Sequence, residues 1–120
     1  MGVVERHCIR ESGVPEAPPM VFAHGFGCDQ NMWRLVAPRF EDRFRVVLFD
    51  YIGAGRSDLA AYDPERYDDL GAYAEDVLEI CRELDLEDVV FVGHSVSSMI
   101  GLLAAAREPS RFDKLVMVGW

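Results

Sequence analysis

The stretch Val89-Val90-Phe91-Val92-Gly93-His94-Ser95-Val96-Ser97 decides how this chain folds. Its first four residues are an uninterrupted apolar run, which is typical of a strand covered on both faces. Residues 95–107 follow at once with a helical pattern that ends before Pro109. The side chains of this helix that are available for burial are Met99, Ile100, Leu102, Leu103 and Ala106. The stretch therefore predicts a buried strand that turns sharply into a helix, with Ser95 at the turn.

A serine at such a turn is typical of a nucleophile elbow. The serine Oγ then projects at the edge of the sheet, near the positive end of the helix. The backbone N–H of the next residue, Val96, points into the same space and can stabilise an oxyanion. Ser97 stands where the pattern G-x-S-x-G has its second glycine, and Gly101 offers a close approach one helical turn later. The alternative is that Ser95 is an ordinary helix N-cap.

Three further runs, at 20–23, 46–49 and 115–118, are short and apolar at successive positions. That pattern favours a parallel sheet with both faces covered. Helical patterns lie between the runs, at 30–40 and 68–84. The expected apolar stripe of the first helix is Met32, Leu35 and Val36, and that of the second is Leu70, Tyr73, Val77, Ile80, Cys81 and Leu84. The alternation of strands and helices predicts an α/β fold with βαβ winding, preceded by a weak strand or hairpin arm in the first ten residues.

Two glycine-rich loops follow the strands at 20–23 and 46–49. The first is His24-Gly25-Phe26-Gly27, and in this kind of fold an H-G-x-G loop supplies a second oxyanion N–H. Phe26 is the expected donor through its backbone, with its ring walling the pocket, although an ordinary glycine-rich turn is the alternative. The second loop, residues 50–57, has Asp58 where a dinucleotide-binding motif needs its third glycine. We therefore expect a turn beside the site rather than a dinucleotide cradle.

Composition excludes several functional classes. The chain has 120 residues, 50% apolar and 28% charged, which favours a single domain. A formal charge of −9 disfavours nucleic acid and anionic membrane surfaces, and no apolar run is long enough to span a bilayer. The three cysteines, Cys8, Cys28 and Cys81, have no zinc-ligand spacing and are typical of reduced thiols. The sequence implies no metal and no cofactor, and the cytoplasm is the expected location.

Taken together, the elbow and the two loops resemble the α/β-hydrolase superfamily. The runs 25–30, 48–58 and 91–97 look like one branch of it, which holds the bacterial stress-signalling hydrolase RsbQ and the plant karrikin and strigolactone receptors. The Ser-Val-Ser variant at residues 95–97 is itself similar to the karrikin-receptor pattern. The resemblance extends over nearly the whole chain, from about residue 21 to residue 118.

The resemblance implies a catalytic triad of serine, aspartate and histidine, in that chain order. The serine carries over onto Ser95 and the oxyanion donors onto Phe26 and Val96. The residues expected to support the pocket and its loop are His24, Gly25, Gly27 and His94. The family's aspartate and histidine belong to later strands and loops, and this sequence ends before both. We expect residues 1–120 to form the N-terminal part of one α/β-hydrolase domain, with a partial parallel sheet flanked by helices and truncated after the strand at 115–118.

Three functional hypotheses follow. The first is a serine hydrolase of small ester- or lactone-like molecules that acts by acyl transfer at Ser95, inactive as this chain alone for want of the triad aspartate and histidine. The second is a non-catalytic module that senses a small-molecule ligand and signals to a protein partner. The third is an incomplete product that associates with itself through the sheet edge at 115–118. Dehalogenases are disfavoured because they use an aspartate at the elbow, whereas peroxidase-like variants keep the serine and stay open.

Overall fold

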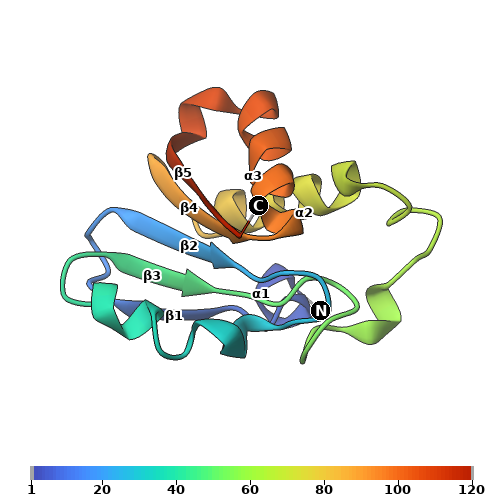
Figure 1. The fold of residues 1–120 in the computed structure, drawn as a ribbon, viewed down its shortest axis with the longest axis horizontal. Helices are drawn as coiled ribbons and strands as arrows, with labels where there is room; N and C mark the ends of the chain where they lie inside the picture. The colour runs from blue at the N-terminus through green and yellow to red at the C-terminus, as the bar shows by residue number, and fades with distance from the viewer. Residues whose placement is uncertain (1, 120) are drawn as a thin grey trace.

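Five strands form one sheet in the computed structural model, which describes residues 2–119 (Figure 1). The strands are β1 (Arg10–Gly13), β2 (Pro19–Ala23), β3 (Arg45–Leu48), β4 (Val89–His94) and β5 (Phe112–Val118). Their spatial order is β1-β3-β2-β4-β5, and only the β1–β3 pairing is antiparallel. The four predicted runs are thus the four parallel strands, and the α/β fold class is confirmed.

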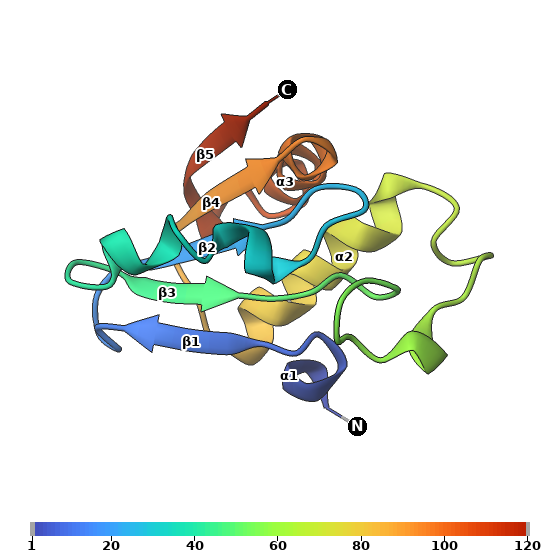
Figure 2. The ribbon, with the colours of Figure 1, turned by 60° about the horizontal axis from the view of Figure 1, so that its bottom comes forward.

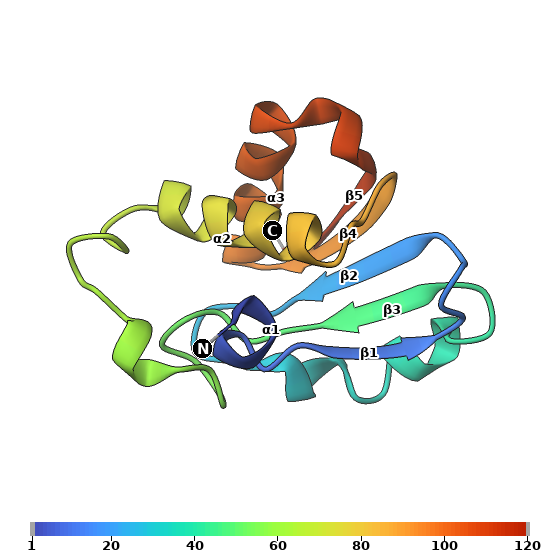
Figure 3. The ribbon, with the colours of Figure 1, turned by 180° about the vertical axis from the view of Figure 1, so that it is seen from behind.

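Helices cover the two faces of the sheet unequally. Helices α1 (Val3–Arg6), α2 (Leu70–Glu83) and α3 (Val96–Arg107) lie on one face, as the view from behind shows (Figure 3). The short 3-10 helices η1 (Gln30–Trp33) and η2 (Ala37–Phe40) lie on the other (Figure 2). Further 3-10 turns, η3 and η4, occupy Leu59–Ala61 and Pro109–Arg111.

Strands β2, β3 and β4 send alternate side chains into two separate apolar clusters. Val21, Val47 and Phe91 pack against α2 and α3 in the larger cluster, whereas Phe22 and Val46 pack against Trp33 in the smaller one. Successive apolar residues in β2, β3 and β4 are therefore buried, apart from the partly buried Leu48 at the end of β3, which is what the unbroken runs indicated. This packing fixes the ends of β2, β3 and β4, and the loops that follow them form the site.

The predicted helix at 30–40 is wrong. Two 3-10 turns stand there instead, because Pro38 has no N–H to donate and disfavours an α conformation at the residue before it. The predicted apolar stripe holds only for Met32, which packs against the smaller cluster, because Leu35 is 73% exposed and Val36 is 41% exposed. Trp33 and Ala37 are buried in their place. The first ten residues also differ from the expected arm, because they begin with α1 and reach β1 only at Arg10.

Strand β5 lies at one edge of the sheet, where it pairs with β4 in parallel. Its side chains are poorly covered, and Val116, Met117 and Val118 are each about two-fifths exposed, at 43%, 44% and 39%. A strand edge of this kind can pair with another strand. Within residues 2–119, no helix combines the length and the apolar character that crossing a bilayer requires.

Candidate active site

The turn between β4 and α3 consists of Ser95 alone. Strand β4 ends at His94 and helix α3 begins at Val96, so the chain reverses direction at this one residue. Ser95 has φ 57° and ψ −121°, a left-handed conformation that is strained for a residue with a side chain. Its side chain makes no capping hydrogen bond to α3 and is partly exposed. Ser95 therefore occupies the N-cap position of α3, but it is not an ordinary N-cap, because the helix does not use its hydroxyl.

Two glycines let the helix approach the strand at this turn. A Cβ on Gly93 would lie 2.6 Å from the carbonyl oxygen of Ser97, which is backbone and cannot move aside. A Cβ on Gly101 would lie 2.6 Å from Cδ2 of the Phe91 ring. Gly101 thus provides the close approach that the second glycine of G-x-S-x-G would otherwise give, as the sequence indicated.

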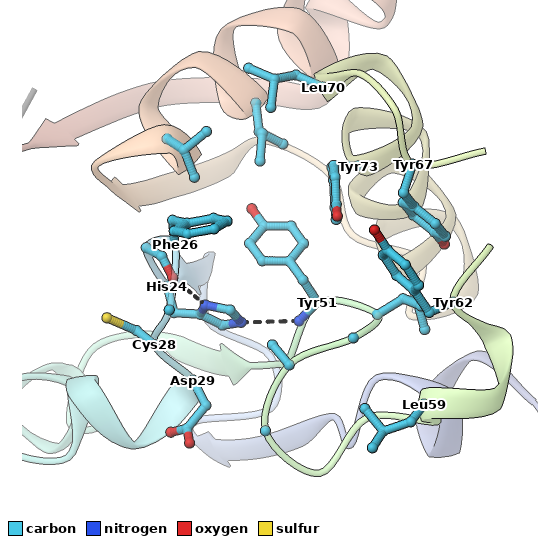
Figure 4. A pocket seen from close by; sticks show the side chains of 18 of the residues that line it. His24, Phe26, Cys28, Asp29, Tyr51, Leu59, Tyr62, Tyr67, Leu70 and Tyr73 are labelled. Atoms are coloured by element: carbon cyan, nitrogen blue, oxygen red, sulfur yellow. Dashed lines mark hydrogen bonds between the residues drawn. The ribbon is translucent and has the colours of Figure 1, made fainter. Parts of the chain in front are cut away.

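The loop after β2 packs directly against the turn. A Cβ on Gly25 would collide with Nδ1 of His94 and would lie 3.3 Å from Cβ of Ser95. Only glycine leaves room for this contact, so the backbone of residues 24–27 passes beside Ser95. Gly27 has φ 77°, which completes the turn of the loop. The side chain of Phe26 is 91% exposed at the mouth of a pocket (Figure 4).

His24 is buried, and both of its ring nitrogens are engaged. The backbone N–H of Tyr51 donates to Nε2 over 3.1 Å, so Nε2 is unprotonated. Nδ1 then carries the proton and donates to the carbonyl oxygen of Gly25 over 2.9 Å. Desolvation by burial lowers the pKa of His24 below its ordinary value of 6.5, which keeps the ring neutral. His24 therefore braces the loop, as the sequence indicated, and has no free nitrogen to accept a proton from Ser95.

His94 belongs to the elbow and points toward the same loop. Its side chain is half-buried, and Nδ1 is a buried atom without a hydrogen-bond partner among the described residues. It lies against Gly25. His94 is therefore a packing neighbour of the turn on the side where the loop passes.

A pocket of about 970 Å³ opens beside the turn (Figure 4). Gly25, Phe26 and Val96 line it from the elbow side, but Ser95 stands at its border rather than in its lining. The opposite wall consists of four tyrosines, Tyr51, Tyr62, Tyr67 and Tyr73, which contact one another in a chain of edge and stacked ring pairs. Burial raises the pKa of Tyr51 and Tyr73, and raises that of Tyr67 to about 12. The phenols of Tyr51, Tyr67 and Tyr73 are therefore neutral at physiological pH, and the four rings form an aromatic wall with hydroxyl groups that can hydrogen bond.

Sequence reasoning missed the anchor of this wall. The Asp76 carboxylate is almost fully buried. It accepts a hydrogen bond from the hydroxyl of Tyr67 over 2.6 Å and forms an ion pair with Arg66 over 3.0 Å. It thereby ties the segment before α2 to the helix itself. The spacing of the sequence could have indicated this buried carboxylate. Asp76 follows Tyr73 by three residues and therefore lies on the apolar face of α2.

The loop at residues 50–57 encloses a carboxylate of its own. Asp50 is buried and accepts the backbone N–H groups of Gln30 and Arg56, each over 2.9 Å. A Cβ on Gly55 would lie 2.6 Å from Oδ2 of Asp50, so a glycine at this position allows the loop to close around the carboxylate. Because β2 separates β3 from β4, Asp50 is not adjacent to Ser95. Among the described residues, no group of three His, Cys, Asp or Glu side chains is arranged to hold a metal ion.

Comparison with known proteins agrees with this geometry. A family model for the alpha/beta hydrolase fold matches residues 18–120. The chain therefore belongs to the α/β-hydrolase fold family. It is 44% identical over 119 residues to Karrikin insensitive 2 receptor CA of Petunia hybrida, covering 98% of this chain and 44% of that protein. It is 43% identical over 101 residues to Strigolactone esterase D14 of Arabidopsis thaliana, covering 84% and 38%.

Solved structures agree as well. A hydrolase from Oleispira antarctica superimposes with a TM-score of 0.92 at 45% identity, covering 96% of this chain and 42% of that one. The resemblance to the karrikin and strigolactone receptor branch is thus confirmed, and the matched proteins include both hydrolases and receptors. This chain spans less than half the length of these relatives.

Proposed function

We propose that this chain carries the nucleophile and the two oxyanion donors of a serine hydrolase that acts on small ester- or lactone-like molecules. The observation that carries the proposal is Ser95 itself. It holds φ 57° between β4 and α3 while its side chain leaves the helix uncapped. Strain of this kind persists only where the surrounding structure enforces it, and it concentrates at functional sites.

The reaction begins with attack of Ser95 Oγ on the carbonyl carbon of the substrate. The C–O double bond opens to an oxyanion, which accepts the backbone N–H groups of Val96 and Phe26. Val96 lies in the first turn of α3, where N–H groups have no partner within the helix. Collapse of the intermediate breaks the ester C–O bond. The departing alkoxide takes up the proton that the Ser95 hydroxyl has lost and leaves as the alcohol. Water then hydrolyses the acyl-serine to the acid and restores the Ser95 hydroxyl.

The general base must come from outside these residues. Both nitrogens of His24 are engaged, and Asp50 lies in the loop after β3, a strand that is not adjacent to β4. The relatives contain a further portion with no counterpart in this chain, and we place the triad aspartate and histidine there. Without the base, only the contribution of binding and the oxyanion hole remains, of order ~10³–10⁴ over the reaction in water. Residues 1–120 alone are therefore a poor catalyst in this account.

A chimera tests the proposal. Residues 1–120 are joined to the portion of the Oleispira antarctica hydrolase that lies outside the match, and hydrolysis of p-nitrophenyl acetate is measured. The chimera is expected to turn over, and its Ser95→Ala variant is expected to lose about 10³-fold or more in kcat. The matched control is Ser98→Ala, which removes another hydroxyl from α3 and should change the rate little. A folded chimera whose Ser95→Ala variant is as active as the parent would overturn the proposal.

A sensing role is the second candidate, favoured by the 44% identity to a karrikin receptor. In that case the tyrosine wall binds a small molecule and a protein partner recognises the complex. The discriminating experiment uses Ser95→Ala in the chimera, with thermal shift as the measure of ligand binding and co-purification as the measure of partner binding. Persistence of both without hydrolysis favours the sensor, whereas loss of partner binding together with hydrolysis favours the enzyme.

A further inference from the structure

The hydroxyl of Ser97 joins two loops that carry different parts of the site. Its Oγ lies 2.5 Å from the carbonyl oxygen of His24 and 2.8 Å from the hydroxyl oxygen of Tyr51. Ser97 is fully buried, and Tyr51 and His24 are nearly so. The three residues come from the first turn of α3, the loop after β3 and the loop after β2. A single side chain therefore connects three elements that are far apart in the sequence.

The direction of each hydrogen bond follows from the available protons. The carbonyl oxygen of His24 can only accept, so Ser97 gives it its one hydroxyl proton. The hydroxyl of Tyr51 must then donate to Ser97 Oγ. Tyr51 also donates its backbone N–H to Nε2 of His24, as Figure 4 shows. The bonds form a closed ring in which each of the three residues contacts the other two, an arrangement that holds their relative positions.

We propose that Ser97 is a positioning residue that sets the separation of the two oxyanion donors, an inference that rests on the proposed function. Ser97 is one residue beyond Val96, and His24 is two residues before Phe26. The Ser97–His24 bond thus joins the helix that carries one donor to the loop that carries the other. Gly25 packs against Ser95 and His94 between them. The two N–H groups are held at a fixed distance because this bond closes across the site.

The family pattern G-x-S-x-G has a glycine at this position, which makes no such bond. A glycine or alanine at 97 leaves the buried carbonyl of His24 and the hydroxyl of Tyr51 without this partner. The neighbouring serine offers a contrast, because the hydroxyl of Ser98 donates over 3.2 Å to the carbonyl of Gly93. That bond remains within the strand–turn–helix unit and does not reach the loop. Ser98→Ala is therefore a matched control for removal of a buried hydroxyl from α3.

The test compares the full chain with Ser97→Ala, Ser97→Gly and Ser98→Ala. One readout is the rate at which a fluorophosphonate labels Ser95, a reaction in which Oγ displaces fluoride and the phosphonyl oxygen occupies the oxyanion site. The other is amide hydrogen exchange at Tyr51, whose buried N–H donates to Nε2 of His24 at the base of the Phe26 loop, and this readout needs no chemistry at Ser95. Both Ser97 variants are expected to label about tenfold more slowly than the parent and to exchange the Tyr51 amide about tenfold faster. Ser98→Ala should stay within about twofold of the parent in both readouts.

The two readouts separate failure of this inference from failure of the proposed function. Parental labelling rates in Ser97→Gly overturn the positioning role, as does slower labelling with unchanged exchange at Tyr51. If the parent itself does not label at Ser95, the proposed function fails. The exchange data then still show whether Ser97 holds the loop, and unchanged exchange overturns that as well. Thermal unfolding of each variant confirms that a slow rate is measured on folded protein.

Discussion

The backbone N–H of Ser95 donates to the carbonyl oxygen of Val118 over 2.9 Å. This bond continues the parallel pairing of β4 with β5 one residue beyond His94, into the turn. The elbow is thereby held from both sides, by β5 on one and by the Gly25 loop from β2 on the other. A strained serine conformation persists here because two neighbouring segments fix the backbone.

That strain is measurable with two substitutions at one position. Ser95→Gly removes the Cβ that makes φ 57° costly, so we expect the free energy of unfolding to rise by about 1 kcal/mol. Ser95→Ala keeps the Cβ and should leave stability near that of the parent, because the lost hydroxyl caps nothing. Urea unfolding of the three proteins checks this. Equal stability of the glycine and alanine variants would show that the turn stores no strain.

Gly93 is predicted to be the least replaceable glycine of the turn. The Cβ of Gly93→Ala would meet the Ser97 backbone 2.6 Å away, forcing β4 and α3 apart at a cost of about 1–3 kcal/mol. Gly2→Ala is the control, because nothing lies within 4 Å of its Cβ position. Thermal unfolding and labelling of Ser95 are measured together. An alanine at 93 that leaves both unchanged would contradict the close contact described.

Asp76 anchors the tyrosine wall of the pocket. Asp76→Ala removes the acceptor for the Tyr67 hydroxyl and for Arg66, and we expect a loss of about 2 kcal/mol in unfolding free energy. Hydrogen exchange in the segment that precedes α2 should rise with it. Asp113→Ala, which removes an exposed ion pair with Lys114, should change stability by no more than about 0.5 kcal/mol. Similar losses in the two variants would contradict a special role for Asp76.

Stability should depend on pH through His24. Because burial lowers its pKa, the unfolded chain binds more protons at this residue than the folded one between the folded pKa and the ordinary value of 6.5. The neutral ring contributes stability that is fully present above about pH 6.5 and is lost as pH falls through the lowered pKa. The urea midpoint is therefore measured from about pH 7.5 to about pH 5 in the parent and in His24→Gln. A flatter dependence in the variant is expected, and parallel curves would contradict this assignment.

The sequence alone predicts the strands and helices that local patterns of apolar residues specify. Unbroken apolar runs predicted all four parallel strands, and the 68–84 pattern matches α2, with Asp69 as its N-cap through a bond from the N–H of Gly71. The strand-to-helix turn at Ser95 could be predicted because Gly93 and Gly101 mark the positions where β4 and α3 approach closely. The helix expected at 30–40 does not form, because the apolar periodicity there is outweighed by Pro38, which interrupts the helical hydrogen bonds.

Long-range contacts account for what could not be predicted. The use of both His24 nitrogens depends on Tyr51, which is 27 residues away in the chain. In the sequence, Ser97 is only a small residue that permits the turn. Its hydrogen bond to the carbonyl oxygen of His24 joins residues that are 73 positions apart. No local pattern encodes such a pairing, because it exists only once β2, β3 and α3 have packed.

The most direct test of the account is to find where a fluorophosphonate reacts on this chain. After prolonged incubation, peptide mass spectrometry is expected to locate one phosphonyl group, on Ser95, with slow kinetics because this account places the triad histidine in the portion of the relatives that this chain does not match. Ser95→Ala should carry none. A modification spread over exposed serines such as Ser12, or one that survives in Ser95→Ala, would contradict the claim that the turn between β4 and α3 presents a nucleophile.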